Sequence, residues 1–341
     1  TALGGGVLFL SIFAAWDFYQ LIPQTAAFAA LLAVTAALGA LALGRDSERL
    51  AVLALSAGFA TPALLGTDDL VPLFGYLVIL VGCFLLVAWR KGWRWVAPLA
   101  LVGKLIYLFG WYEDRYTSAK LLPTVAFATA LFAEFSAYLL LRARLAPDDP
   151  RRPRNVELLL LPINAGWYGI LLYATLYQDH RWWLTAAVVA LGALHLGAAR
   201  LVTDREPARV AAARMIFAGL ALTFVTAAIP IRLEGEAITI AWAIEAALLV
   251  WAGFRTDVRA LRGAGVVLLI AAIALLFGQW GGADRLLLNA RFASFATVVA
   301  ALALSAYWAR SRWDDLDSVE RRLFSGVAIA VSAVAVWGLS C

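Results

Sequence analysis

The sequence predicts an all-α fold, a polytopic bundle of transmembrane helices. Composition is the first observation, because 63% of the residues are hydrophobic and 15% are charged, whereas ordinary soluble domains carry about 25% charged residues. The second is that apolar runs of about 17–25 residues, the length that crosses a bilayer as a helix, recur along the whole chain. The third is that the arginines lie almost entirely between these runs. Most of the chain is therefore expected to face lipid or other helices.

The apolar runs, taken in order, give about thirteen expected spans. They cover residues 3–18, 24–43, 49–65, 70–89, 95–111, 121–142, 156–177, 183–201, 209–229, 236–254, 262–280, 290–310 and 322–340. The connections between them are too short to hold a soluble catalytic domain. The third run contains Gly58, Thr61 and Pro62, and a proline removes a backbone N–H, so we expect this helix to bend or to stop early.

The lysines and arginines predict which side of the bilayer each loop occupies. Twenty of them lie in loops after even-numbered spans, and six lie in loops after odd-numbered spans. Because cytoplasmic loops carry the excess of positive charge, the even side is expected to be cytoplasmic. Residue 1 is then cytoplasmic and Cys341 lies outside, in a bacterial cytoplasmic (inner) membrane. The chain begins with Thr1 rather than Met, and we expect it to be a piece of a longer polypeptide.

Short internal matches predict two parallel repeats of six helices. Tyr19-Gln20 recurs as Tyr177-Gln178, and Ser136-Ala137-Tyr138 recurs as Ser305-Ala306-Tyr307. Because six is an even number of spans, both repeats insert the same way up. The expected divisions are a first repeat over 1–145, a cytoplasmic linker rich in Pro, Asp and Arg over 146–155, a second repeat over 156–311, and an additional transmembrane helix over 312–341.

Composition also limits the chemistry that the chain can carry. Two histidines and one methionine are too few soft or imidazole ligands for a haem or copper centre. Cys83 lies inside an apolar run and Cys341 ends the chain, so neither is expected in a disulfide. We expect no metal, no cofactor and no nucleic acid, because the basic residues follow the pattern of membrane orientation. The expected partners are the lipid bilayer, and other membrane subunits or the rest of a longer chain.

Ionisable side chains inside the expected spans mark the candidate polar site. Lys104 and Glu134 lie near the middle of two successive spans, and Arg214 and Glu245 lie in another successive pair. A charged side chain at the bilayer centre costs about 2.5–3.5 kcal/mol on insertion scales, so each needs a partner, a water-filled cavity or a proton. We therefore expect two buried ion pairs, Lys104–Glu134 and Arg214–Glu245. They either fix helix packing or form a polar cavity or proton relay; for Arg214, near a helix end, the third alternative is contact with lipid headgroups.

Three further features belong to the candidate site. His195 is a single polar residue in an apolar helix, and such a residue more often forms a hydrogen bond to a neighbouring helix than binds a ligand. Asn164 and Gln279, which are not part of the site, have the same interpretation. Trp242 lies one turn before Glu245. In the segment Gly58–Pro62, carbonyls freed by the proline either coordinate a cation or substrate, or the proline simply ends the helix near the outer surface.

Several of these stretches resemble one known family. The Gly-Phe-x-Thr-Pro segment Gly58–Pro62 lies within Arg45–Leu65, and together with Leu73–Tyr76 and the Trp-x-x-Glu-Ala motif at Trp242–Ala246 it is similar to a bacterial predicted-membrane-protein family, domain of unknown function 2339. The opening Leu8–Pro23 is similar too, so the resemblance covers most of the chain. It implies a multi-pass membrane protein, and because that family has no established activity it implies no substrate.

Three functions remain open. The favoured one is a transporter, or a protein that handles lipid or an envelope component, with a polar site between the repeats. The first alternative is a non-enzymatic scaffold or accessory subunit of a membrane complex, whose buried charges are dry and matched. The second is an outward-facing enzyme similar to the polyprenyl-linked glycosyltransferases, which the short outer loops disfavour. That enzyme requires at least two outer carboxylates to converge in one groove, from the set Asp17, Asp68, Asp69, Glu113 and Asp114.

Overall fold

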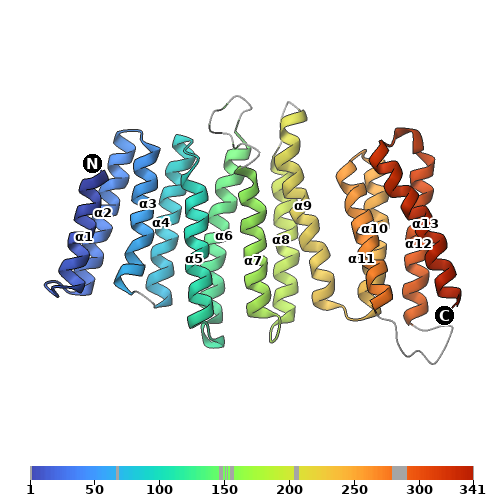
Figure 1. Ribbon diagram of the computed structural model, residues 1–341, viewed down its shortest axis with the longest axis horizontal. Coiled ribbons are helices and arrows are strands. Elements are labelled where there is room, and N and C mark those ends of the chain that lie inside the picture. Colours follow the sequence, from blue (N-terminus) through green and yellow to red (C-terminus); the bar gives the residue numbers. More distant parts are fainter. Residues whose placement is uncertain are drawn as a thin grey trace. The chain divides into compact units, whose positions relative to one another are not determined.

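A computed structural model describes residues 2–66, 69–145, 149, 151, 153, 157–202, 207–278 and 290–340, and of residues 2, 3, 207–212, 290 and 338–340 it describes the backbone alone. Within these residues the chain forms thirteen α-helices and no strand, which confirms the all-α prediction (Figure 1). The helices are α1 (Ala2–Asp17), α2 (Gln24–Gly44), α3 (Glu48–Leu65), α4 (Leu70–Lys91), α5 (Val96–Arg115), α6 (Leu121–Ala143), α7 (Leu160–Leu176), α8 (Arg181–Leu201), α9 (Pro207–Arg232), α10 (Glu236–Arg255), α11 (Arg259–Gly278), α12 (Ala290–Ser311) and α13 (Ser318–Ser340).

Each helix corresponds to one of the expected spans. Within the described residues, ten helices are long and apolar enough to cross a membrane. Three helices fall outside that group: α1, whose apolar part Gly4–Asp17 is shorter, α5 and α13. The sequence explains the last two, because α5 carries Lys104 in its middle and ends in acidic and basic residues, and α13 has Glu320 and two arginines in its first turns. A multi-pass membrane protein is the class that this helix set fits.

The third helix does not stop at its proline. α3 continues through Pro62 to Leu65 and ends at Gly66, whose φ of 61° and ψ of 34° place it in the left-handed region that glycine adopts without strain. Of the two expected effects of the proline, the early stop was therefore wrong, and the bend stays a prediction. A proline in the last turn of a helix removes one hydrogen bond, and a nearby side chain can supply a replacement.

The helices pack in two compact units. Unit 1 comprises Thr1–His180 and Ala190–Leu222, and unit 2 comprises Arg181–Val189 and Thr223–Cys341, so α8 and α9 contribute to both. The predicted division into two six-helix repeats and a last helix stays a prediction. Most of the predicted linker over 146–155 lies outside the described residues.

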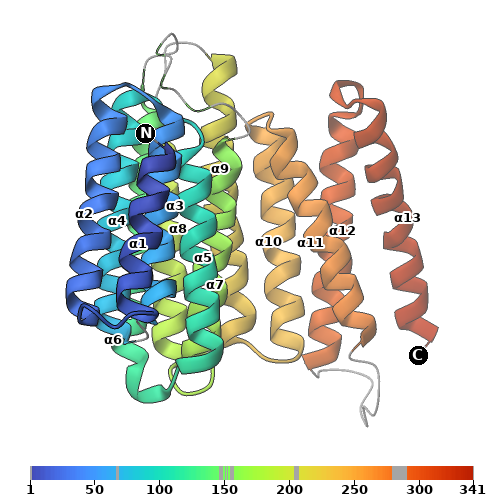
Figure 2. The ribbon, with the colours of Figure 1, turned by 60° about the vertical axis from the view of Figure 1, so that its left-hand side comes forward.

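In unit 1, a continuous apolar core joins the helices from α3 to α7. Phe74 and Leu77 of α4 pack in this core with Leu131 and Phe135 of α6, and all four are at most 1% exposed. α2 packs along α3, and α4 packs along both α5 and α6. Figure 2 shows the axes of these helices nearly aligned. Aligned helices of similar length are the arrangement expected of elements that cross one bilayer.

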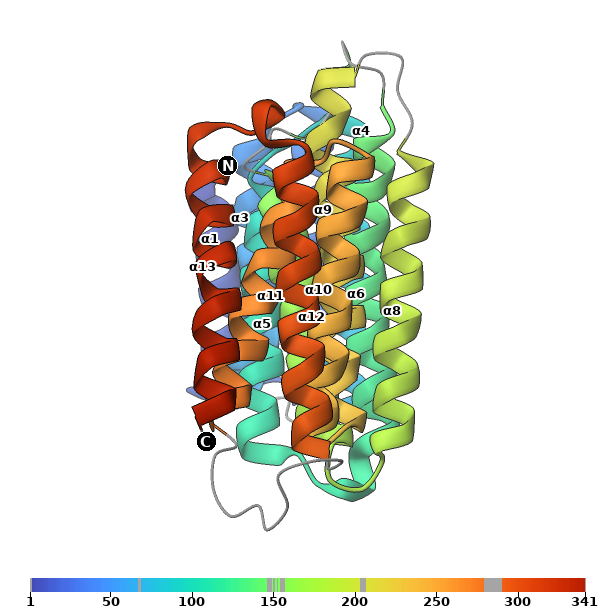
Figure 3. The same cartoon turned by 90° about the vertical axis from the view of Figure 1, so that its right-hand side faces the viewer.

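In unit 2, the closest packing is between α10 and α11. α10 also contacts α12, and α12 contacts α13 (Figure 3). A Cβ atom placed on Gly265 of α11 would lie 2.8 Å from the carbonyl oxygen of Ala246 and 3.0 Å from the backbone nitrogen of Val250, both on α10. One placed on Gly253 of α10 would lie 2.8 Å from the backbone nitrogen of Arg262. Glycine at both positions thus lets two helix backbones come into contact, a form of packing common in membranes.

Candidate functional site: a buried polar cluster in unit 1

Lys104 lies near the middle of α5 and is 2% exposed. Its Nζ donates a hydrogen bond to Oδ1 of Asn164 on α7 and another to the carbonyl oxygen of Leu131 on α6, at 3.3 Å. The ammonium also lies 4.3 Å from the centre of the Phe135 ring, close enough for a cation–π interaction. These contacts use the donors of the ammonium, but because both acceptors are neutral they leave its positive charge uncancelled.

Asn164 links α7 to α6 as well as to Lys104. Its Nδ2 donates to the carbonyl oxygen of Phe132 at 3.2 Å and lies 3.5 Å from Oγ of Ser136. With Nδ2 so placed, Oδ1 faces the lysine and acts as its acceptor. The expectation that Asn164 forms interhelical hydrogen bonds is therefore confirmed.

Glu134 lies on α6 near Lys104, but no ion pair joins these two described residues. The half-buried carboxylate points toward α4, where a Cβ atom on Gly82 would lie 3.0 Å from Oε1. Its Oε2 is buried and has no hydrogen-bond partner among the described residues. The predicted direct pair was thus wrong in its geometry, although the two opposite charges still interact electrostatically. The reason is that Lys104 reaches toward α6 and α7, whereas Glu134 reaches toward α4.

His195 packs close to the same cluster in unit 1. It is 1% exposed, and its ring lies between Phe132 and Phe217, with centroid distances of 6.1 and 6.2 Å. Its Nδ1 lies 2.8 Å from the carbonyl oxygen of Leu191, one turn earlier in α8. This hydrogen bond lies within its own helix, and together with the aromatic contacts it fits a packing role.

Glu245 and Trp242 form a second polar position, in unit 2. Oε1 of Glu245 on α10 accepts a hydrogen bond of 2.6 Å from the Thr226 hydroxyl on α9. Oε2 of Glu245 and the indole N–H of Trp242 are buried without a partner among the described residues. Arg214, the predicted partner of Glu245, is exposed and belongs to unit 1, so that ion pair stays a prediction.

The segment Gly58–Pro62 is braced by a tyrosine. Pro62 has no N–H, so the carbonyl oxygen of Gly58, four residues earlier, loses its helical donor. The hydroxyl of Tyr76 on α4 supplies the replacement, at 2.8 Å. The Thr61 hydroxyl donates to the carbonyl oxygen of Ala57 at 3.1 Å. The freed carbonyl, which the sequence offered as a ligand for a cation or substrate, is therefore satisfied inside the protein.

We expect Tyr76→Phe to lower the free energy of unfolding by about 1 kcal/mol, because it removes one hydrogen bond and leaves the carbonyl oxygen of Gly58 without a donor. Tyr107→Phe is the matched control. The Tyr107 hydroxyl donates to the carbonyl oxygen of Phe59. The residue four positions after Phe59 has a backbone N–H that can donate to the same carbonyl within the helix, so Tyr107→Phe should lower the free energy of unfolding by less. In a Pro62→Ala background, which restores the missing N–H, Tyr76→Phe should cost less. Equal costs in both backgrounds, measured by denaturant titration in micelles, would contradict this account.

The structure also contains two buried arginines that sequence reasoning counted only as loop charges. Arg142, at the end of α6, is 1% exposed; its Nη1 lies 2.6 Å from the Tyr138 hydroxyl and its Nη2 lies 3.2 Å from Oε2 of Glu157. Arg262, at the start of α11, is 4% exposed, and its Nε lies 2.7 Å from Oε1 of Glu320. The sequence did contain a signal for these ion pairs, because Glu157 and Glu320 each lie in a connecting region that is otherwise rich in arginine.

Exposed residues extend the Arg262 cluster. Nη1 of Arg259 lies 2.9 Å from Oδ2 of Asp317, the residue just before α13. Oδ1 of Asp317 accepts hydrogen bonds from the backbone N–H groups of Glu320 and Val319, at 2.8 and 2.9 Å. These bonds favour the charged carboxylate and hold the pKa of Asp317 below its ordinary value. The cluster therefore caps the first turn of α13 and ties it to α11.

The outer acidic residues that the structure describes lie at the ends of three helices. Asp17 ends α1, Asp69 precedes α4, and Glu113 and Asp114 lie in the last turn of α5. Asp68 lies outside the described residues. Among the residues that the structure describes, no group of three or more His, Cys, Asp or Glu side chains is placed to hold a metal ion.

Comparison with known proteins identifies the family of the chain. No curated protein and no solved structure matches the chain. A sequence model described as Predicted membrane protein (DUF2339) matches residues 1–340, and so includes the braced segment of α3, the Lys104 cluster and the motif at Trp242–Ala246. This match confirms the resemblance drawn from the sequence. The chain belongs to the DUF2339 family of predicted membrane proteins.

Proposed function

We propose that this chain is a proton-coupled transporter, for a small solute or an envelope lipid component, and that Lys104, Asn164 and Glu134 form its proton-exchanging site. The observation that carries the proposal is the buried Oε2 of Glu134, which has no hydrogen-bond donor among the described residues although a lysine ammonium lies nearby. A charge pair kept only for packing gains most when its members touch and all their polar atoms are satisfied. Here Lys104 binds neutral oxygens instead, and Oε2 of Glu134 has no donor among the described residues.

The neutral partners of Lys104 support this assignment. Because Asn164 and the Leu131 carbonyl accept its hydrogen bonds, the lysine keeps its position whether Glu134 is charged or protonated. The glutamate is therefore free to gain and lose a proton without breaking the helix contacts around it. Intramembrane carboxylates of this kind are typical of proton relays in pumps and transporters.

The distribution of charge supports a location in the bacterial cytoplasmic membrane. The excess of arginine in the loops after even-numbered spans favours a cytoplasmic position for those loops and for residue 1. In this orientation the Arg142 and Arg262 clusters lie near the cytoplasmic headgroups, where arginine is least costly to bury.

Solid-supported membrane electrophysiology on the reconstituted protein tests the proposal. A pH jump should produce a transient current as protons bind inside the membrane field, and Glu134→Gln should abolish it. Glu113→Gln, which alters an acid in the last turn of α5, is the matched control and should leave the current unchanged. A wild-type protein without a transient current, or one that keeps it in Glu134→Gln, would contradict a proton-exchanging role.

A scaffold or accessory subunit is the second candidate function. The full set of contacts around Lys104, with two oxygen acceptors and an aromatic ring, favours it, because such a cluster can also serve only to orient α5, α6 and α7. In this case Glu134→Gln and Lys104→Met should each lower the melting temperature in nanodiscs, and the double variant should recover much of the loss. The pH jump should then give no current.

A further inference from the structure

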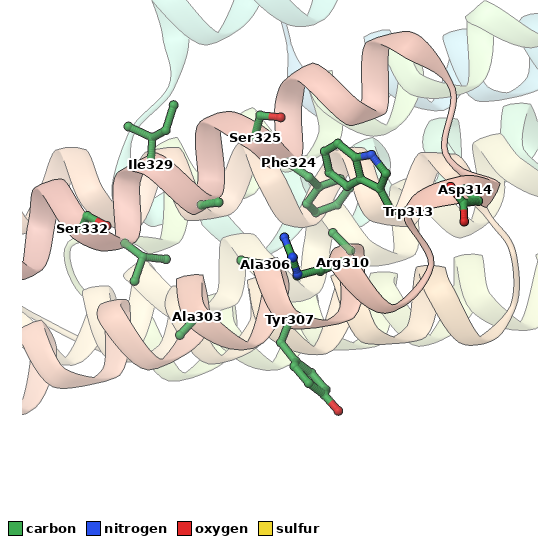
Figure 4. Close-up of a pocket in the computed structure, with 13 residues that line it drawn as sticks. Ala303, Ala306, Tyr307, Arg310, Trp313, Asp314, Phe324, Ser325, Ile329 and Ser332 are labelled. Atoms are coloured by element: carbon green, nitrogen blue, oxygen red, sulfur yellow. The ribbon is translucent and has the colours of Figure 1, made fainter.

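We propose that the groove between α12 and α13 binds one anionic phospholipid, with its phosphate on Arg310 and an acyl chain along the groove. The groove has a volume of about 840 Å³ and lies entirely within unit 2. Figure 4 shows it opening between the two helices. This site is independent of the Lys104 cluster and of the proposed proton exchange.

The walls of the groove fit a hydrocarbon chain. Small side chains line both sides, Ala303 and Ala306 on α12 and Ser325, Ala328 and Ser332 on α13. These small side chains leave space between the helix backbones, and Phe324, which is 2% exposed, also lines the groove. The volume lies within the range of about 300–1,000 Å³ that is usual for small-molecule sites. A helix surface of this kind inside a bilayer is covered by lipid unless another helix covers it.

One end of the groove fits an anionic headgroup. Arg310 lies in the last turn of α12, and Figure 4 shows its side chain directed into the space between the helices, beside Phe324 and Trp313. It has no hydrogen bond or ion pair to any described residue, although the neighbouring Arg259 and Arg262 both have carboxylate partners. A planar guanidinium without a carboxylate partner is well suited to bind a phosphate.

The position of this cation along the helix agrees with a lipid ligand. Trp313, 37% exposed, lies at the same end of the groove, and tryptophan is enriched at the level of the lipid headgroups. Arg321 and Arg322 lie near the same helix ends and add positive charge, which attracts acidic lipids. Asp314 also lines the groove and lies at this same end, beyond Trp313 from Arg310 in Figure 4. No ion pair joins it to Arg310, so the guanidinium of Arg310 is the charged group directed into the space between the helices.

Native mass spectrometry of the full chain in detergent, titrated with phosphatidylglycerol or phosphatidylethanolamine, tests this inference. We expect one tightly held phosphatidylglycerol and weaker binding of phosphatidylethanolamine. Arg310→Gln should weaken phosphatidylglycerol binding about tenfold, the usual effect of losing one charge-assisted hydrogen bond, and Arg310→Lys should retain most of it. Arg312→Gln is the matched control, because Arg312 does not line the groove, and it should bind like the wild type.

A second variant tests the acyl-chain half of the site. Ala306→Leu, which places a larger apolar side chain in the groove, should weaken the binding of both lipids while Arg310 is intact. Equal losses in Arg310→Gln and Arg312→Gln would overturn the proposal, since they would show only general attraction to positive charge. Competition by glycerol phosphate at the same concentration as the lipid would also overturn it, because the site would then recognise a soluble anion. A dimer that disappears in Ala306→Leu would assign the groove to a second copy instead.

Discussion

Gly265→Ala is expected to lower the free energy of unfolding by about 3 kcal/mol, the upper end of the usual cost of overpacking. The new methyl group would meet the carbonyl oxygen of Ala246 at 2.8 Å and the nitrogen of Val250 at 3.0 Å. Both are backbone atoms of α10, and they cannot rotate away as a side chain can. Relief requires α10 and α11 to separate, which also loosens the apolar contacts along both helices.

Gly263 provides the matched control on the same helix. A Cβ atom placed there meets nothing within 4 Å, so Gly263→Ala should raise stability by as much as about 1 kcal/mol through the better helix propensity of alanine. The two variants add the same methyl group two positions apart and should change stability in opposite directions. Titration with a denaturing detergent, followed by tryptophan fluorescence, measures both.

A third variant separates side-chain from backbone contact. The new methyl group on residue 265 would also lie 2.6 Å from Cγ2 of Val250, and Val250→Ala removes that atom. If the backbone contact dominates, the double variant Val250→Ala with Gly265→Ala should remain as unstable as the sum of its parts. A full recovery in the double variant would show that side-chain crowding alone makes glycine necessary at this position.

Arg262→Gln should cost about 3 kcal/mol of unfolding free energy, because it removes the buried cation of Glu320 and leaves its carboxylate only the exposed guanidinium of Arg259, 3.9 Å from Oε2. Glu320 is 8% exposed, and Nε of Arg262 lies 2.7 Å from its Oε1. Arg262 also donates to the carbonyl oxygen of Gly253 at 3.2 Å, so the substitution removes an interhelical bond between α10 and α11 as well. The same titration in detergent measures the change.

Arg259 gives the contrast within the same cluster. Its side chain is 67% exposed where it meets Asp317 at 2.9 Å and, more distantly, Glu320 at 3.9 Å, and an exposed ion pair is worth at most about 1 kcal/mol. Arg259→Gln should therefore change stability by much less than Arg262→Gln. Adding Glu320→Gln to Arg262→Gln should recover part of the loss, because no uncompensated charge then remains. If the two arginine variants cost the same, burial does not control the energy of this cluster.

Local composition was enough to predict the positions of the helices. The runs around α2, α4 and α11 are apolar enough to lie within a bilayer, where a helix satisfies the backbone polar groups by its own hydrogen bonds. The positions of these helices therefore do not depend on the rest of the chain. Proline was a less certain guide. Pro62 predicted a bend or an early stop, but the Tyr76 hydroxyl replaces the lost hydrogen-bond donor, so α3 continues to Leu65. That replacement comes from another helix and is invisible in the local sequence.

The candidate site was predicted in part. The sequence identified Lys104 and Glu134 because a charge within an apolar run is rare, and the structure places both on neighbouring helices of unit 1. It did not identify Asn164 as the acceptor of Lys104, because α5 and α7 are not consecutive and their contact depends on how each helix is rotated. The pairing of Lys104 with Glu134 was wrong for the same reason.

The sequence by itself determined that the chain is a bundle of membrane helices, where each helix lies, and which few residues carry charge inside it. These features follow from the free energy of transferring each segment from water to lipid, and that energy depends on local composition alone. Only the tertiary structure decided that Lys104 binds neutral oxygens, that Arg142 and Arg262 are buried with glutamates, and that Gly265 but not Gly263 is required by packing. These features depend on the rotation and spacing of neighbouring helices, because a shift of one residue turns a side chain by about 100° around its helix axis.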